Sequence, residues 1–144
     1  MTTVGTLIRA KSEKPVIHSV RPDQMVRAAL ELMKVHDIGC VLVMEGDELR
    51  GIFSERDYAR KMILVGKTSH DTPVSEIMTP EVICTSPSNS VDECLALTNK
   101  HGFRHLPVKE GDRVVGMVST GDLISSIIKE QQETIDHLQQ YIAS

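Results

Sequence analysis

The chain has 144 residues, of which 40% are apolar and 25% charged, which is the composition of a globular protein. Its core is expected to be aliphatic, because the chain contains no Trp and only two Phe and two Tyr. Its formal net charge of −4 argues against a general polyanion binder, because affinity for a phosphate backbone needs clustered Lys and Arg.

The chain contains the same pattern twice, at an offset of 65 residues. Positions 22–58 and 87–123 are identical at twelve of thirty-seven places. Each copy ends in Gly-apolar-x-Ser-x-x-Asp, from Gly51 to Asp57 and from Gly116 to Asp122. Two copies in one short chain predict a pseudo-twofold pair, in which each copy covers an apolar face that the other cannot bury alone.

Each copy begins with a strand-like segment and an amphipathic helix. The strands are expected at residues 16–20 and 82–85, and a proline follows each of them. In the helices, apolar residues recur at i, i+3, i+4 and i+7 from Val26 and again from Val91, where Thr98 weakens the stripe.

Two strands and a second helix complete each copy. Apolar runs at residues 40–44 and 105–108 lead through Glu-Gly-Asp turns to strands at 49–53 and 114–118. Helices are expected from Ser54 and from Ser119. The predicted fold is α/β (α+β), built from two β-α-β-β-α repeats at residues 6–64 and 76–128.

The segments outside the repeats are a linker, two leading segments and a C-terminal extension. Residues 66–75 read as an exposed loop, and residues 74–78 resemble residues 4–8, so a short leading helix is expected for each copy. Residues 129–144 are expected to extend the last helix. Ile124, Ile128, Gln131, Ile135, Leu138 and Ile142 follow one another at intervals of three and four residues, a heptad-like spacing that is apolar except at Gln131. This helix either packs on a second subunit or a partner, or lies back on its own domain.

Cysteine usage and the N-terminus predict a soluble, cytoplasmic protein. Cys40, Cys84 and Cys94 are odd in number and lie in apolar contexts, which favours reduced core thiols over disulfides. The N-terminus has no signal-peptide pattern, and no apolar run approaches the roughly 20 residues of a membrane span. The histidines lack Cys or His neighbours at metal-ligand spacing, so no metal site is expected.

The repeated Ser-x-x-Asp motif has a structural and a functional interpretation. As a helix cap, its serine and aspartate satisfy backbone N–H groups at the start of a helix. As a ligand site, a helix start favours phosphate, and an aspartate one turn later can accept both hydroxyls of a ribose. The glycine three residues before each serine permits close approach of another backbone or of a ligand.

The complete pattern resembles a known family. The paired units, together with residues 54–61 (SERDYARK), 76–79 (EIMT) and 104–108 (RHLPV), are similar to the CBS module, the tandem domains named after cystathionine β-synthase, and to small bacterial proteins made of two such domains. The resemblance implies a non-catalytic regulatory sensor that binds AMP, ADP, ATP or NAD in clefts between the repeats, and a homodimer. A polynucleotide-binding or structural module is the alternative, and a nucleotide-acting enzyme is less favoured.

The resemblance also implies site residues. Asp57 and Asp122 would hold ribose hydroxyls, while Ser54 and Ser119 would contact phosphate, with Arg56 as a further phosphate partner. Backbone and apolar side chains of the first and second strands would hold the base: Ile17, Ser19, Val20, Ile38, Cys40, Ile83, Thr85, Arg104, His105 and Leu106. No catalytic residue is expected.

The two copies differ where they are expected to bind. Arg56 aligns with Gly121, and Arg104 and His105 align with Gly39 and Cys40. We therefore expect two non-equivalent sites whose affinities differ at least tenfold, or by about 1.4 kcal/mol.

Overall fold

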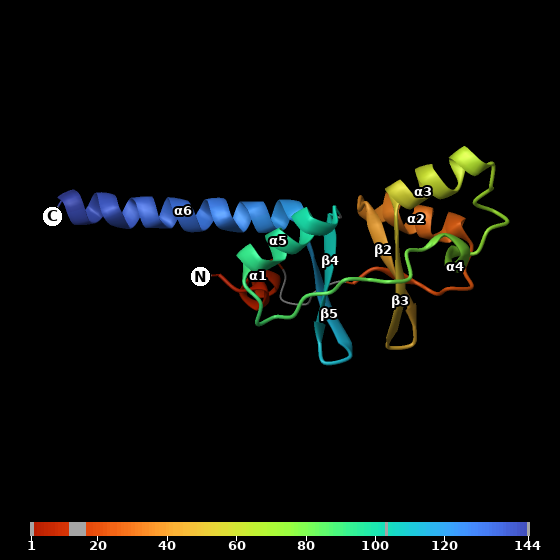
Figure 1. Cartoon of the computed structure of the whole chain (residues 1–144), viewed down its shortest axis with the longest axis horizontal. Coiled ribbons are helices and arrows are strands. Elements are labelled where there is room, and N and C mark those ends of the chain that lie inside the picture. Colours follow the sequence, from red (N-terminus) through yellow and green to blue (C-terminus); the bar gives the residue numbers. More distant parts are fainter. Residues whose placement is uncertain (1, 12–16, 103, 144) are drawn as a thin grey trace. The chain divides into compact units, whose positions relative to one another are not determined.

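The computed structural model describes residues 2–11, 17–102 and 104–143, which form two compact units. The first-copy unit consists mainly of residues 17–83. The second-copy unit contains the N-terminal helix and most of the chain from Cys84 onward (Figure 1). The described residues contain six α-helices and two small sheets, which confirms the predicted mixed α and β class.

The first-copy unit has the predicted order of strands and helices. Its elements are β1 (Ser19–Val20), α2 (Val26–His36), β2 (Cys40–Glu45), β3 (Glu48–Ser54), α3 (Glu55–Lys61), the 3-10 turn η1 (Ile63–Val65) and α4 (Val74–Ile77). The sheet order is β1-β2-β3, with β1 parallel and β3 antiparallel to β2. Residue 16 of the expected first strand lies outside the described residues.

The core of the first-copy unit forms on the predicted helix face. Val26, Ala29 and Met33 of α2 are buried, and they pack in one cluster with strand residues such as Phe53. Between β2 and β3 the turn begins at Gly46, whose φ of +61° suits glycine at the first central position of a two-residue hairpin. The apolar spacing of the sequence therefore identified both the helix and the face that it buries.

The second-copy unit repeats this arrangement with a shorter first strand. It contains α1 (Val4–Lys11), α5 (Val91–His101), β4 (His105–Glu110), β5 (Arg113–Ser119) and α6 (Thr120–Ala143). The expected strand at residues 82–85 is reduced to one parallel bridge between Thr85 and Val108, which lies 65 residues after the pairing of Val20 with Val43.

A proline explains why this strand is shorter. In the first copy, the Leu42 N–H donates to the His18 carbonyl at 3.1 Å. The matching donor position in the second copy is Pro107, which has no N–H, so the equivalent bond to Ile83 cannot form. The sequence placed the segment correctly, but its expected length was wrong.

The two leading helices are exchanged between the copies. The short helix α4 precedes the second copy in the sequence but packs in the first-copy unit, where the Val74 N–H donates to the Gln24 carbonyl at 2.8 Å. The helix α1 precedes the first copy but packs in the second-copy unit, where the Val4 N–H donates to the Asn89 carbonyl at 2.9 Å. Each helix therefore completes the core of the copy that it does not lead.

The repeated glycines are explained by these docked helices. A Cβ atom at Gly51 would lie 2.6 Å from the Met78 sulfur and 2.9 Å from the Thr79 carbonyl oxygen, and one at Gly116 would lie 3.1 Å from an Ile8 methyl group. Of the two uses that the sequence left open for each glycine, close approach of another segment of the chain is the one that the structure shows.

The last helix, α6, runs from Thr120 to Ala143 without a break at residue 129. Among the described residues, no helix combines the length and the apolar character that crossing a membrane requires.

Candidate functional site

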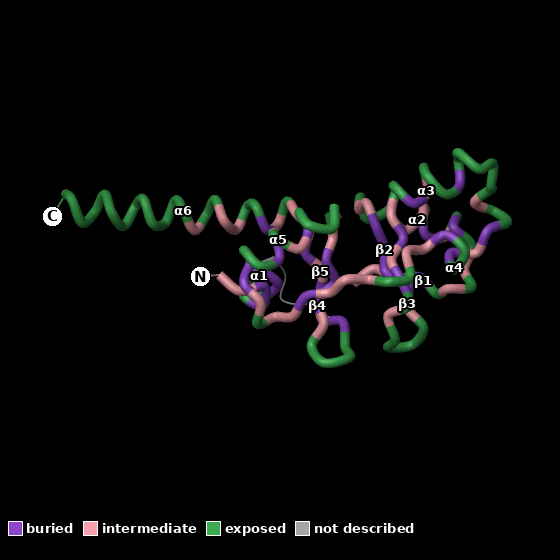
Figure 2. Tube along the Cα trace, in the orientation of Figure 1, coloured by how far each residue is buried: buried purple, intermediate pink, exposed green. Residues whose placement is uncertain are grey.

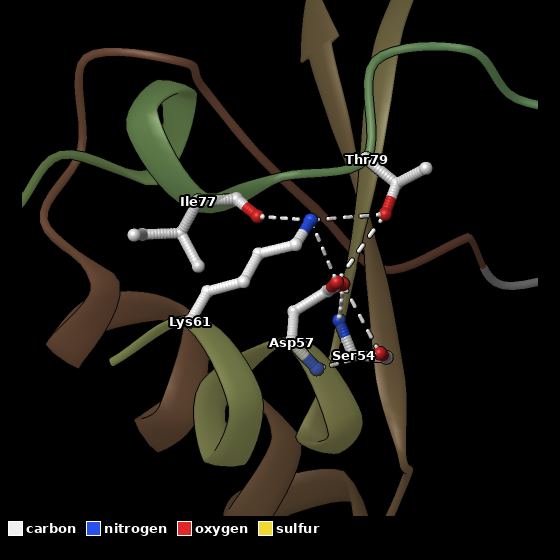
Figure 3. Close-up of polar contacts among 5 residues, drawn as sticks. All are labelled: Ser54, Asp57, Lys61, Ile77 and Thr79. Atoms are coloured by element: carbon white, nitrogen blue, oxygen red, sulfur yellow. Dashed lines mark hydrogen bonds and ion pairs between the residues drawn. The ribbon is translucent and has the colours of Figure 1, made fainter. Parts of the chain in front are cut away.

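In the first copy, Ser54 and Asp57 form a reciprocal cap at the start of α3. The Asp57 N–H donates to the Ser54 hydroxyl oxygen at 3.2 Å, and the Ser54 N–H donates to Asp57 Oδ2 at 2.9 Å (Figure 3). The Ser54 hydroxyl also donates to Oδ2 at 3.1 Å. The structural interpretation of the motif is therefore correct, since these bonds satisfy backbone donors at the helix start.

The second oxygen of Asp57 is occupied as well. Oδ1 lies 3.0 Å from the Lys61 ammonium and accepts a hydrogen bond from the Thr79 hydroxyl at 3.2 Å. Lys61 also donates to the Ile77 carbonyl at 3.1 Å, so Figure 3 shows its ammonium among three oxygen atoms. Asp57, which is only 8% exposed, thereby ties α3 to the end of α4.

The second copy repeats the cap. The Ser119 N–H donates to Asp122 Oδ2 at 2.9 Å, and the Asp122 N–H donates to the Ser119 hydroxyl oxygen at 3.0 Å. Four residues after Asp122, at the position that matches Lys61, stands Ser126. The two caps are therefore alike, while the residues beside them differ.

Each cap lies at one edge of its sheet, next to the start of the second strand. In the first copy, Cys40 pairs with Ser54, and the Glu55 N–H donates to the Gly39 carbonyl at 3.1 Å. In the second copy, the Thr120 N–H donates to the Arg104 carbonyl at 2.8 Å. Each copy thus brings its serine, its aspartate and the start of its second strand together at a matching place.

The predicted base-holding residues fall into two groups by exposure. Four of them have buried side chains that belong to the interior of their units, namely Val20, Cys40, Thr85 and Leu106. The others keep partly or fully exposed side chains, namely Ile17, Ser19, Ile38, Ile83, Arg104 and His105. The buried group could offer a ligand mainly backbone atoms, whereas the second group offers side chains. Arg56 is exposed on the first turn of α3.

The cysteines of the chain form no disulfide. Burial, with the nearby carboxylates of Asp57 and Glu55, raises the pKa of the Cys40 thiol to about 12. Burial also raises the pKa of Cys84 and of Cys94, and the Thr85 hydroxyl lies 3.0 Å from the Cys94 sulfur. Nucleophilic chemistry requires the thiolate, which these raised pKa values disfavour, and Cys40 and Cys94 are buried in the core.

Two contacts near the site were not predicted. The bonds of Lys61 and Thr79 to Asp57 were not predicted from the sequence, although the i, i+4 spacing of Asp57 and Lys61 on one helix was a usable signal. His18 and His36 stack with ring centroids 3.8 Å apart. Burial and the neighbouring His36 lower the pKa of His18.

Within the described part of the chain, no three side chains of the metal-binding types gather closely enough to hold an ion. The candidate site is organised by the hydrogen bonds of the caps and by the adjoining strand ends.

Comparisons with known proteins identify the family. A model of the CBS domain matches residues 11–64 and 74–129. A solved structure from Burkholderia ambifaria, described as that of a signal-transduction protein with CBS domains, is 44% identical in sequence to this chain. Its TM-score is 0.86, and the match covers 90% of this chain and 96% of that one.

Two curated relatives agree. The mitochondrial CBS domain-containing protein CBSX3 of Arabidopsis thaliana is 36% identical over 125 residues, which span 83% of this chain and 61% of that protein. The CBS domain-containing protein YhcV of Bacillus subtilis is 35% identical over 107 residues, which span 74% of this chain and 76% of YhcV. The chain therefore belongs to the CBS-domain family, as a tandem pair of CBS domains of the kind that is commonly regulatory and ligand-binding.

Proposed function

We propose that this protein is a non-catalytic regulatory sensor that binds an adenine nucleotide, AMP, ADP, ATP or NAD, at two sites. The observation that carries the proposal is the repetition of one polar arrangement. Both copies place a serine and an aspartate in the same hydrogen-bonded geometry beside the start of the second strand. A doubled site of this kind suits a ligand with a phosphate and a sugar.

In this proposal the aspartates hold the ribose and the serines contact the phosphate. The ligand acts as a signal by binding one conformation of the protein more tightly than another, because only differential affinity can shift an equilibrium. The proposal includes a homodimer that presents the signal to a regulated protein, and a cytoplasmic location, which the thiol state of the cysteines supports.

The two sites are proposed to differ in affinity at least tenfold, or by about 1.4 kcal/mol. Two features support this difference. Arg56 has glycine, Gly121, as its counterpart, so only the first copy has a guanidinium there. Asp57 Oδ1 is bound by Lys61 and Thr79, and Ser126 stands at the position of Lys61 in the second copy, so the groups with which ribose hydroxyls must compete differ between the copies.

Titration calorimetry with each of the four nucleotides tests this function. Two sites of unequal affinity are expected for at least one nucleotide, and Asp57→Asn or Asp122→Asn should each remove one of them. Asp47→Asn and Asp112→Asn are matched controls, because these exposed aspartates occupy the same place in the two hairpin turns. If all four variants bind as the unchanged protein does, the assignment of the ribose to Asp57 and Asp122 is wrong.

An exchange between the copies tests the role of Arg56. Arg56→Gly should weaken the first site and Gly121→Arg should strengthen the second, with a larger effect for ATP than for AMP because the guanidinium would contact phosphate. Position 121 has room for the new side chain, since a Cβ atom there meets nothing closer than the Ser119 hydroxyl at 3.6 Å. Equal effects for both nucleotides would exclude a contact of the guanidinium with the β and γ phosphates, which only ATP carries.

A further inference from the structure

The helix α6 has two apolar faces, and its own unit covers only one of them. On the covered face, Leu123 is fully buried, and Ile127 and Glu130 are partly buried. The Thr2 hydroxyl donates to the Glu130 carboxylate at 3.1 Å on this face. The alternative in which α6 lies back on its own domain therefore accounts for the first turns of the helix and for this face only.

The second face is exposed along the whole helix. Ile124, Ile128, Ile135, Leu138 and Ile142 keep between 45% and 82% of their surface exposed. From Gln131 to Ala143 every described residue is exposed, as the green end of α6 shows in Figure 2. A helical segment of this length is marginal in water unless an apolar face is packed. The exposed face therefore needs an occupant.

The spacing of the exposed residues fits one kind of occupant. With Ile128, Ile135 and Ile142 at position a of a heptad, Ile124, Gln131 and Leu138 fall at position d. Isoleucine at a with leucine at d favours a parallel coiled coil of two helices, and the chain has isoleucine at all three a positions and leucine at one d position, Leu138. The pattern holds over three consecutive a positions, Ile128, Ile135 and Ile142.

The charges of α6 are consistent with a second copy as the partner. In the segment from Ser125 to Ala143, each charged residue and the histidine stand at the outer positions b, c or f, namely Lys129, Glu130, Glu133, Asp136 and His137. The flanking e and g positions are uncharged, namely Ser125, Ile127, Gln132, Thr134, Gln139 and Tyr141. Two identical helices can pair along such a face without bringing like charges together, whereas a face that selects a different chain usually carries complementary charges at e and g.

Gln131 adds a preference for register. Its side-chain amide is both a donor and an acceptor, so two Gln131 side chains at one level can bond to each other. In a parallel, in-register pair Gln131 meets its own copy, whereas a shifted pair would place each amide against isoleucine or leucine. A polar residue at one core position of a coiled coil commonly sets register in this way.

We infer that residues 124–142 of α6 form a parallel, in-register two-stranded coiled coil with the same segment of a second copy of this chain. The face defined by positions a and d, which we call the α6 seam, lies apart from the residues proposed to bind nucleotide. The inference specifies the surface and the orientation of the dimer that belongs to the proposed function, and it does not depend on the ligand.

Sedimentation of the full-length chain tests the seam. We expect a dimer, and we expect the double variant I135D/L138D to weaken dimerisation by about tenfold or more, because it puts like charges into the seam. The matched control is E133Q/D136N, which changes two outer positions of the same turns and should leave the dimer unchanged. A monomeric unchanged protein, or a dimer that I135D/L138D does not weaken, would overturn the inference.

Cross-linking tests the orientation. Ile142→Cys should form an intermolecular disulfide under mild oxidation, since a parallel in-register pair brings the two 142 positions together. Ala143→Cys, which stands at the outer position b, is the control and should cross-link much less. Equal cross-linking of the two variants would contradict the parallel arrangement.

Calorimetry on I135D/L138D separates this inference from the proposed function. Retained nucleotide binding in a monomeric variant leaves the seam and the nucleotide sites both supported. If the protein forms the dimer and the Ile142→Cys cross-link but binds no nucleotide, the proposed ligand is wrong and the α6 seam is still supported.

Discussion

The caps of the two copies have the same backbone bonds, but the residues beside the two aspartates differ. In both copies the serine and aspartate satisfy each other at the helix start. Asp57 additionally bonds Lys61 and Thr79, which joins α3 to the end of α4. The matching positions hold Ser126 and Arg9. The carboxylate thus belongs to the same cap in both copies, and in the first copy it also joins two helices.

The cause of this difference lies in the segment after each leading helix. Thr79 precedes Pro80, which favours extended backbone, so α4 ends at Ile77 and Thr79 forms a bridge with Ile52. The helix α1 continues to Lys11, which keeps Arg9 in a helix. The hydroxyl group beside Asp57 therefore depends both on Pro80, which ends the helix, and on threonine in place of arginine at this position.

The largest expected effect tests the helix exchange. Ile77 of α4 and Leu7 of α1 occupy matching positions and are buried. Ile77→Ala and Leu7→Ala should each lower the free energy of unfolding by about 3 kcal/mol, because each leaves a cavity in the core. Urea denaturation measures both values.

The control for this pair is Glu76→Gln, on the exposed side of α4, which should change stability by less than about 0.5 kcal/mol. An unchanged stability for Leu7→Ala would show that α1 does not dock on the second copy in solution.

The next effect compares the repeated glycines. Gly51→Ala should destabilise by about 2–3 kcal/mol, because its new methyl group would meet a backbone oxygen that cannot move freely. Gly116→Ala should cost about 1 kcal/mol, because only the Ile8 side chain must shift. Thermal unfolding of the two variants gives the order. Gly121→Ala, in open surroundings, is the control and should be neutral or slightly stabilising. Equal costs at positions 51 and 116 would contradict the expectation that the neighbour of Gly51 yields less than the Ile8 side chain does.

A smaller effect concerns the ion pair of Lys61 with Asp57. Lys61→Met should lower stability by about 1 kcal/mol or less, because the Lys61 side chain is 43% exposed and solvent weakens the ion pair. Calorimetry should at the same time show tighter nucleotide binding at the first copy, since a competitor for Asp57 is removed. Ser126→Met is the matched change in the second copy and should alter neither quantity strongly. Weaker binding by Lys61→Met would mean that Lys61 contacts the nucleotide directly.

The smallest effect is a dependence on pH that only the first copy should show. The pKa of His18 is lowered from 6.5 by burial and by His36, so the unfolded chain binds the proton more readily than the folded chain. The stability from neutral His18 is present above pH 6.5 and is lost as the pH falls below it. The second copy has Ile83 at the matching position.

Urea denaturation between neutral and mildly acidic pH checks this. His18→Asn should reduce the loss of stability at acidic pH, while His101→Asn, which changes the counterpart of His36, should not. A profile that His18→Asn leaves unchanged would assign the pH dependence to other groups.

Much of the fold followed from local sequence patterns. The offset of 65 residues located both copies, and the spacing from Val26 identified the buried face of α2. The Ser-x-x-Asp spacing predicted both caps, because a serine and a residue three positions later are always close at a helix start. These features can be predicted from the order and spacing of residues alone, without knowledge of the tertiary structure.

Other features depended on distant neighbours. The similarity of residues 74–78 to residues 4–8 predicted two leading helices but could not say which copy each would join. The effect of Pro107 on the strand at Thr85 required knowledge of which residue lies opposite. The glycines before the two serines were read as space for a backbone or a ligand, and only the docked helices decided between these uses.

The amino-acid sequence by itself determined the repeat, the β-α-β-β-α order, the two caps and the heptad spacing of α6. Each of these features is visible in the order and spacing of residues, without knowledge of which segments pack together. The tertiary structure alone decided the exchange of α1 and α4, the bond from Thr79 to Asp57, and which face of α6 its own unit leaves exposed. Those outcomes follow from packing between segments far apart in the chain, where burial and backbone hydrogen bonding select one partner among several that local propensity permits.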